Sequence, residues 1–145
     1  KGDRLEWMVQ KLTELGVSDM VFVDCERSVV KWTSERGAQQ LLRLTRVARE
    51  AAMQSRRVWL PALRGPLDYA DVIALPGAVI ADPDGGSLAG FDNDPHSGRI
   101  VVIGPEGGFS AAEVGMSRHS VSLGQQILRV ETAAVCAAVL LSSPR

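Results

Sequence analysis

Apolar residues occur along this chain in two patterns, short continuous runs and stretches with helical spacing. Four short runs, at residues 20–24, 78–81, 100–103 and 120–123, predict buried strands, because a strand covered on both faces is apolar at nearly every position. Helical patterns or start signals predict helices at residues 3–15, 34–55, 66–75, 110–119 and 131–141, with a short extended piece at 59–61. The alternation predicts a single α/β domain over residues 1–145, with a parallel sheet and helices on both faces.

Helix start and stop signals support these boundaries. Two pairs have the spacing of a capping box, Asp3 with Glu6 and Ser110 with Glu113. Gly16 is a typical residue after a helix end, and Ser34 is expected to cap the long second helix. A strand normally precedes the first helix of an α/β unit, and none does here, so we expect the chain to be a fragment of a longer protein.

Two turn-rich segments, at residues 104–108 and 123–129, each follow a predicted strand and lead into a predicted helix. Ligands of α/β proteins usually bind at such carboxyl ends of strands. Gly104, Gly107 and Gly108 allow a backbone to approach a ligand closely. Neither segment has the Gly-Lys-Ser/Thr of a P-loop or the GxGxxG pattern of a dinucleotide fold. We expect the two segments to form one small-molecule site, although a plain tight turn also explains the glycines.

Charged residues in these segments are candidates for catalysis. Arg129 is a cation near the start of a helix, where the helix dipole disfavours it, so a functional reason is worth considering. Glu131 is favoured there by the same dipole and needs no function. Glu106, inside the glycine turn, is either functional or a solvent-facing carboxylate.

The net charge of −1 conceals an asymmetry between the halves of the chain. Residues 1–64 hold 12 Lys and Arg against 8 Asp and Glu, whereas residues 65–145 hold 4 against 9. The basic first half indicates either a nucleic-acid-binding face or an ordinary solvated arginine face. The long polar segment 82–99, with four aspartates, does not suit RNA and is expected to be a mobile surface loop.

Other compositional features narrow the class of protein. Cys25 and Cys136 lie in apolar surroundings and are expected to be free thiols of a cytoplasmic protein. No metal site is expected, because the surroundings of His96 and His119 lack zinc-ligand spacing. No apolar run is long enough to span a membrane.

Several motifs in order resemble the RsmE family of bacterial 16S ribosomal RNA methyltransferases. They are IGPEGGFS at 103–110, LGQQILRVETAA at 123–134, KGDRLEWMVQKLTELGV at 1–17, ERSVVKW at 26–32 and EAAMQSRR at 50–57. The resemblance implies the SPOUT fold, whose C-terminal segment, about 100–145 here, is threaded into a trefoil knot. It also implies a homodimer that methylates N3 of a uridine in 16S ribosomal RNA of the small ribosomal subunit. The family's PUA-like N-terminal RNA-binding domain would be absent from this chain.

The resemblance implies S-adenosylmethionine as the methyl donor, bound within the knot. Its expected contacts are Ala81, Asp82, Ile103, Gly104, Pro105, Glu106, Gly107, Gly108, Leu123, Gly124, Ile127, Leu128 and Ala133.

The expected chemistry is an in-line methyl transfer to a uracil that loses its N3 proton. Glu106 or Glu131 is the candidate base, if a separate base is needed, and Arg129 the candidate stabiliser of charge on the uracil. Candidate contacts to RNA phosphates are Arg27, Lys31, Arg49, Arg56 and Arg57.

Two alternatives remain open at this point. One is a SPOUT methyltransferase that acts on another RNA position or on a ribose 2′-hydroxyl. The other is a catalytically silent domain that binds the cofactor or RNA.

Overall fold

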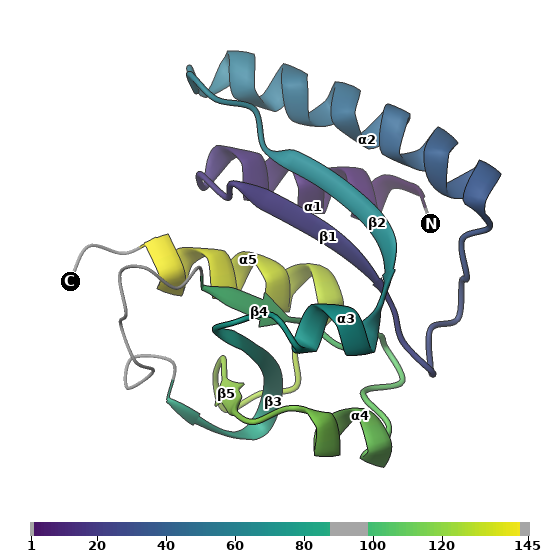
Figure 1. Cartoon of the computed structure of the whole chain (residues 1–145). Helices are drawn as coiled ribbons and strands as arrows, with labels where there is room; N and C mark the ends of the chain where they lie inside the picture. The colour runs from purple at the N-terminus through teal and green to yellow at the C-terminus, as the bar shows by residue number, and fades with distance from the viewer. Residues whose placement is uncertain (1, 88–98, 143–145) are drawn as a thin grey trace.

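A computed structural model describes residues 2–87 and 99–142 (Figure 1). Five helices and five strands alternate within these ranges. In order they are α1 (Gly2–Glu14), β1 (Asp19–Asp24), α2 (Ser34–Gln54), β2 (Ala62–Asp68), α3 (Tyr69–Ile73), β3 (Ala78–Ser87), β4 (Ile100–Val102), α4 (Ala111–Met116), β5 (Ser120–Ser122) and α5 (Val130–Ser142).

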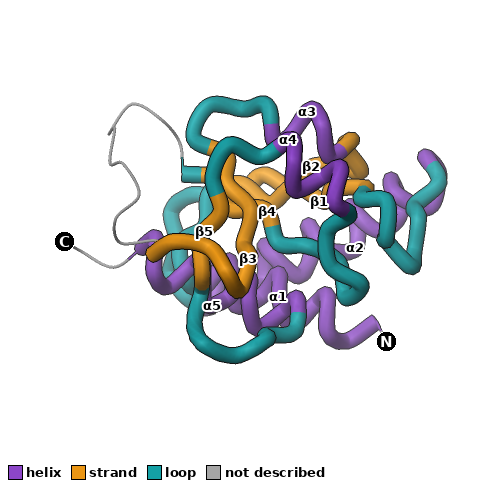
Figure 2. Tube along the Cα trace, turned by 90° about the horizontal axis from the view of Figure 1, so that it is seen from below, coloured by secondary structure: helices purple, strands orange, loops and turns teal. Residues whose placement is uncertain are grey.

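The described strands pair in parallel, in two groups. β1 pairs with β2, and β3 lies between β4 and β5. Helices α1, α2 and α5 lie on one side of the strands, and α3 and α4 lie on the other (Figure 2). The predicted α/β class, with parallel pairing and helices on both faces, is confirmed. The predicted single sheet is instead divided into these two groups.

The buried side chains form a cluster on each side of the strands. On one side α1, α2, β1 and α5 contribute Val9, Leu44, Met20 and Ala138. On the other side Tyr69 and Val72 of α3 pack with Ile80 of β3. The four runs predicted to be buried strands supply much of this core, which explains why they were visible in the sequence.

The structure corrects the prediction for residues 59–75. β2 is a strand that the pattern did not reveal, and the predicted helix at 66–75 begins only at Tyr69. The strand's sequence, ALRGPLD, contains glycine, proline and charged residues, which are rare in strands. Pairing with β1, from Asp19 opposite Ala62 to Asp24 opposite Asp68, outweighs that weak local preference.

Two predicted helix caps differ from those in the structure. Helix α1 includes Gly2, so Asp3 lies in its first turn rather than before it. The cap of α2 is Thr33 rather than Ser34, and the Thr33 hydroxyl accepts a hydrogen bond from the Arg36 amide at 3.4 Å. Gly16 has a φ of +87°, as expected of a residue that ends a helix.

Strand β3 extends well beyond its predicted end at residue 81. Val121 of β5 lies opposite both Ala81 and Gly86, so the residues between them form a bulge at the edge of the site. The first part of the predicted loop at 82–99 is therefore strand. Residues 88–98 of that loop, with Asp92, Asp94 and His96, lie outside the described residues.

The approach of this bulge to β5 makes Gly85 sensitive to substitution. A Cβ atom there would lie 2.6 Å from the backbone of Val121. Overpacking of this kind costs about 1–3 kcal/mol, so we expect Gly85→Ala to lower the free energy of unfolding by that amount in urea titrations. Gly86→Ala is the matched control, because Gly86 is the neighbouring residue and its Cβ position has one contact, at an ordinary 3.9 Å from the Ser120 carbonyl oxygen. Equal stability of the two variants would contradict the β3–β5 approach.

Candidate active site

The ends of β4 and β5 and the bulge of β3 meet at one edge of the β4–β3–β5 group. Ile80 of β3 lies opposite Val102 of β4 and Ser120 of β5. Because the three strands run in the same direction, this is the carboxyl edge, where α/β proteins bind ligands. Of the three segments predicted to contact a cofactor, residues 103–108 and 123–128 follow β4 and β5, whereas residues 81–82 lie within β3, at the start of its bulge.

Glycines shape two of these segments in different ways. Gly108 and Gly124 have φ values of +71° and +151°, which side chains rarely adopt. At Gly107 and Gly104 the lack of a side chain instead allows a neighbouring side chain to pack closely. A Cβ atom at Gly107 would lie 3.3 Å from the Arg27 Cβ, and one at Gly104 would lie 3.1 Å from the ring of Phe109. Part of the glycine pattern therefore serves loop packing.

The predicted capping box at the start of α4 is present, and its carboxylate has a second partner. Glu113 accepts hydrogen bonds from the backbone amides of Ser110 and of Glu26, both at 2.8 Å. Only 3% of Glu113 is exposed. The Tyr69 hydroxyl donates to the Glu113 carbonyl at 2.7 Å. Glu113 thus joins the loop after β1 to the glycine turn after β4, a role that its spacing did not indicate.

Two ionisable groups beside Glu113 are held neutral. Burial, followed by the nearby Glu113 charge, raises the pKa of the Cys25 thiol to about 11 and that of Tyr69 to about 12. Cys25 is therefore a thiol rather than a nucleophilic thiolate at neutral pH. The prediction of free cysteines is confirmed, with Cys25 buried and Cys136 half-buried.

The two candidate bases approach one cation that the sequence did not reveal. The guanidinium of Arg4 lies 3.8 Å from a Glu106 oxygen and 3.9 Å from a Glu131 oxygen. The side chain of Glu131 is 18% exposed, whereas that of Glu106 is 73% exposed. Arg4 lies on α1, a hundred residues from either carboxylate, so no local spacing links the three.

The second loop and the start of α5 hold the other candidates. Arg129 is exposed, and its carbonyl accepts the Ala133 amide at 2.8 Å in the first turn of α5. Ile127 is 90% exposed, whereas Ala133 is buried. Leu123 packs against the core at Val121, and Leu128 is half-buried. The loop therefore exposes the apolar side chain of Ile127, two residues before the exposed Arg129.

Four predicted RNA contacts lie on exposed surface. Arg27 donates to the Gly107 carbonyl at 3.1 Å, and Lys31 lies 3.6 Å from a carboxylate oxygen of Asp24. The remaining two, Arg49 and Arg56, are exposed near the end of α2. Arg27 is the one of the four that contacts the predicted cofactor loops.

Arg57 has a structural role that the sequence did not suggest. Its guanidinium donates to the carbonyls of Thr13 and Val17 at 3.0 Å each, and to that of Gly16 at 3.5 Å. These carbonyls lie at the end of α1, where a cation is favourable. These hydrogen bonds are a sufficient structural reason for an arginine at position 57, whether or not it contacts RNA.

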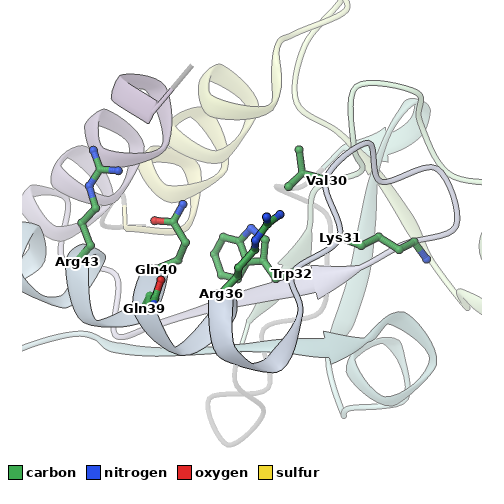
Figure 3. A pocket seen from close by; sticks show the side chains of 7 residues that line it. All are labelled: Val30, Lys31, Trp32, Arg36, Gln39, Gln40 and Arg43. Carbon is green, nitrogen blue, oxygen red and sulfur yellow. The ribbon is translucent and has the colours of Figure 1, made fainter.

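A shallow cleft of about 410 Å³ opens between the loop after β1 and helix α2 (Figure 3). Its lining residues are Val30, Lys31, Trp32, Arg36, Gln39, Gln40 and Arg43. Of these, only Lys31 was a predicted site residue. The four helical members recur at positions i, i+3, i+4 and i+7, the spacing of one helix face, so their common polar face was a readable signal.

Two kinds of feature are absent from residues 2–87 and 99–142. That part of the chain holds no group of three or more His, Cys, Asp or Glu residues able to bind a metal. It also holds no helix that is long and apolar enough to cross a membrane.

Comparisons with known proteins agree on one family. The family model described as an RNA methyltransferase domain matches residues 1–142. Ribosomal RNA small subunit methyltransferase E of Bacillus subtilis is 32% identical over 158 residues, covering 98% of this chain and 62% of that protein. The corresponding protein of Aquifex aeolicus is 34% identical, covering 90% of this chain and 59% of its own length.

Solved structures give the same result. Ribosomal RNA small subunit methyltransferase E from Neisseria gonorrhoeae, bound to S-adenosyl methionine, superposes with a TM-score of 0.85 at 29% identity. The match covers 97% of this chain and 62% of that one. A putative methyltransferase from Legionella pneumophila, solved with bound cofactor SAM, has a TM-score of 0.83 at 31% identity, with 97% and 61% coverage. The chain thus spans about 60% of the length of these relatives.

The buried Glu113 carboxylate is expected to be important for stability. In Glu113→Gln the amide group must face one of the two backbone N–H donors, which leaves that donor unsatisfied. We expect the free energy of unfolding to fall by about 2–4 kcal/mol in urea titrations. Glu50→Gln, on the exposed side of α2, removes the same charge and should change it by less than about 0.5 kcal/mol. Similar losses in both variants would rule out the carboxylate link.

Proposed function

The chain belongs to the RNA methyltransferase domain family, and from that premise we propose that it methylates N3 of a uridine in 16S ribosomal RNA, with S-adenosylmethionine as donor. The structural observation that carries the proposal is the meeting of the β3 bulge with the loops after β4 and β5 at one edge of the β4–β3–β5 group. Relatives named as small subunit methyltransferases, and neighbours solved with the cofactor, support the substrate and the donor.

The proposal extends to the architecture of the intact protein. Residues from about 100 onward form the trefoil knot of a SPOUT methyltransferase, and two copies form a homodimer. A PUA-like domain of the intact protein binds RNA, and the enzyme acts in the cytoplasm on the small ribosomal subunit. The greater length of the relatives is consistent with an additional domain.

The edge has features that suit S-adenosylmethionine. Nothing lies within 4 Å of the position that a Cβ atom would take at Gly108 or Gly124, so a ligand can approach the backbone of both loops closely. Ile127, exposed to 90%, offers an apolar surface that an adenine ring can cover. When bound, this cofactor supplies an electrophilic methyl group on a sulfonium.

The chain's own residues then have two tasks on the uracil. The first is to remove the N3 proton, and we assign it to Glu131. Its side chain is shielded from water and fixed at the start of α5, whereas that of Glu106 is largely exposed. The second task is to stabilise the negative charge left on the uracil oxygens, which we assign to Arg129. Arg4 orients the Glu131 carboxylate from the side of α1.

Calorimetry followed by an RNA assay tests the function as a whole. The intact protein should bind S-adenosylmethionine and should methylate unmodified small ribosomal subunits, with N3-methyluridine found by nucleoside mass spectrometry. A 2′-O-methyl nucleoside, or a different methylated base, would favour the other SPOUT activity. Cofactor binding without methyl transfer would indicate a silent binding domain, and no heat of binding would refute the proposal.

Arg129→Ala should separate catalysis from cofactor binding. Loss of a donor that stabilises developing charge costs about 10²-fold in kcat, whereas the Kd for the cofactor should not change. Arg118→Ala removes an exposed arginine outside the predicted cofactor segments and serves as the control. If single-turnover rates of the two variants agree, Arg129 does not stabilise the uracil.

The two carboxylates differ in their expected effect on the rate. Glu131→Gln should lower kcat by about 10²–10³-fold, as expected for removal of a general base. Glu106→Gln should retain most of the rate. Single-turnover measurements compare both variants with the wild type, and an unchanged rate in Glu131→Gln would exclude Glu131 as the base.

A further inference from the structure

The cleft between the loop after β1 and α2 shares one wall with the candidate site. That wall is the loop that contains Lys31 and Trp32, and Arg27 of the same loop donates to the Gly107 carbonyl in the glycine turn. The other wall is α2, where Arg43 forms an ion pair with Glu6 of α1. The cleft is therefore linked to the site through the loop after β1.

The lining of the cleft has the chemistry of a single-stranded nucleic-acid groove. It combines cationic side chains with an indole and two amides. Figure 3 shows Trp32 beside Arg36, with the other polar residues along α2, whereas the side chain of Lys31 points away from them. Cations bind phosphates, aromatic rings stack with bases, and glutamine amides donate and accept at base edges.

The cations of the cleft differ in how far they are already neutralised. Lys31 lies near Asp24, and Arg43 is paired with Glu6. Arg36 is exposed, and no ion pair of its side chain occurs among the residues that the structure describes. Trp32 packs against Phe22, with ring centroids 4.9 Å apart, which fixes the indole beside Arg36. Arg36 is thus the cation best placed to receive an external phosphate.

We propose that this cleft binds a single-stranded segment of the RNA substrate that flanks the target nucleotide. Arg36 contacts a backbone phosphate, Trp32 supports an unstacked base, and Gln39 and Gln40 contact its edge. The proposal rests on the proposed function, because it identifies the anionic partner as the methylation substrate. It adds a binding surface outside the predicted cofactor segments. This surface is also distinct from Arg49 and Arg56, the predicted RNA contacts near the end of α2.

The test compares two arginines of the same helix in the intact protein. Arg36→Gln should raise the Kd for a fluorescently labelled single-stranded ribosomal RNA oligonucleotide about tenfold. It should also reduce the slope of log Kd against log salt concentration by about 0.7, the value for one lost phosphate contact on a single strand. Arg46→Gln, an equal loss of charge on α2 outside the cleft lining, should change both quantities little. Fluorescence anisotropy at several salt concentrations gives both, and thermal melts verify that each variant is folded.

A kinetic measurement separates the cleft from the chemistry. In Arg36→Gln the KM for small ribosomal subunits should rise, while kcat at saturating RNA and the calorimetric Kd for S-adenosylmethionine stay unchanged. The cleft proposal would be overturned if Arg36→Gln bound RNA as tightly as the wild type, or if Arg36→Gln and Arg46→Gln lost the same RNA affinity. Neither result would contradict the proposed methyltransferase function. Failure of the wild-type protein to bind S-adenosylmethionine would instead refute the proposed function.

Discussion

The buried carboxylate of Glu113 is the contact on which the arrangement of the site depends. A carboxylate that is 3% exposed is tolerable only when donors replace the water that it has lost, and two backbone amides do so here. One belongs to Ser110, at the start of α4, and the other to Glu26, at the end of β1. The loop that carries Arg27 is thereby fixed against the glycine turn, and the cleft beside α2 takes one wall from that same loop.

Local sequence was a good guide wherever the local preference and the tertiary contacts agreed. The runs at 78–81 and 100–103 are apolar because both faces of β3 and β4 are covered, so their strands were visible. Ser110 and Glu113 form the capping box that their spacing predicts. β2 shows the opposite case, since its polar sequence becomes a strand through pairing with β1, and pairing partners cannot be read from a single segment.

The site could be predicted as loops but not as contacts between side chains. Glycine turns after strands indicated where the loops lie, because strand ends and glycine conformations are local properties. Arg4 was missed because its partners, Glu106 and Glu131, are brought to it only by the packing of α1 near the second half of the chain. Arg57 was assigned to RNA on charge alone, whereas the carbonyls that it binds become available only when α1 ends beside it.

The charge asymmetry between the halves of the chain has a structural counterpart in these contacts. Arg4 and Arg27, from the basic half, approach acceptors of the glycine turn in the acidic half. Arg4 is 57% exposed and lies 3.8 and 3.9 Å from its partners, so each pair contributes at most about 1 kcal/mol to stability. Glu113 makes shorter hydrogen bonds, at 2.8 Å, with the backbone amides of Ser110 and Glu26. The arrangement of the loop after β1 beside the start of α4 therefore depends on Glu113 more than on the exposed ion pairs of Arg4.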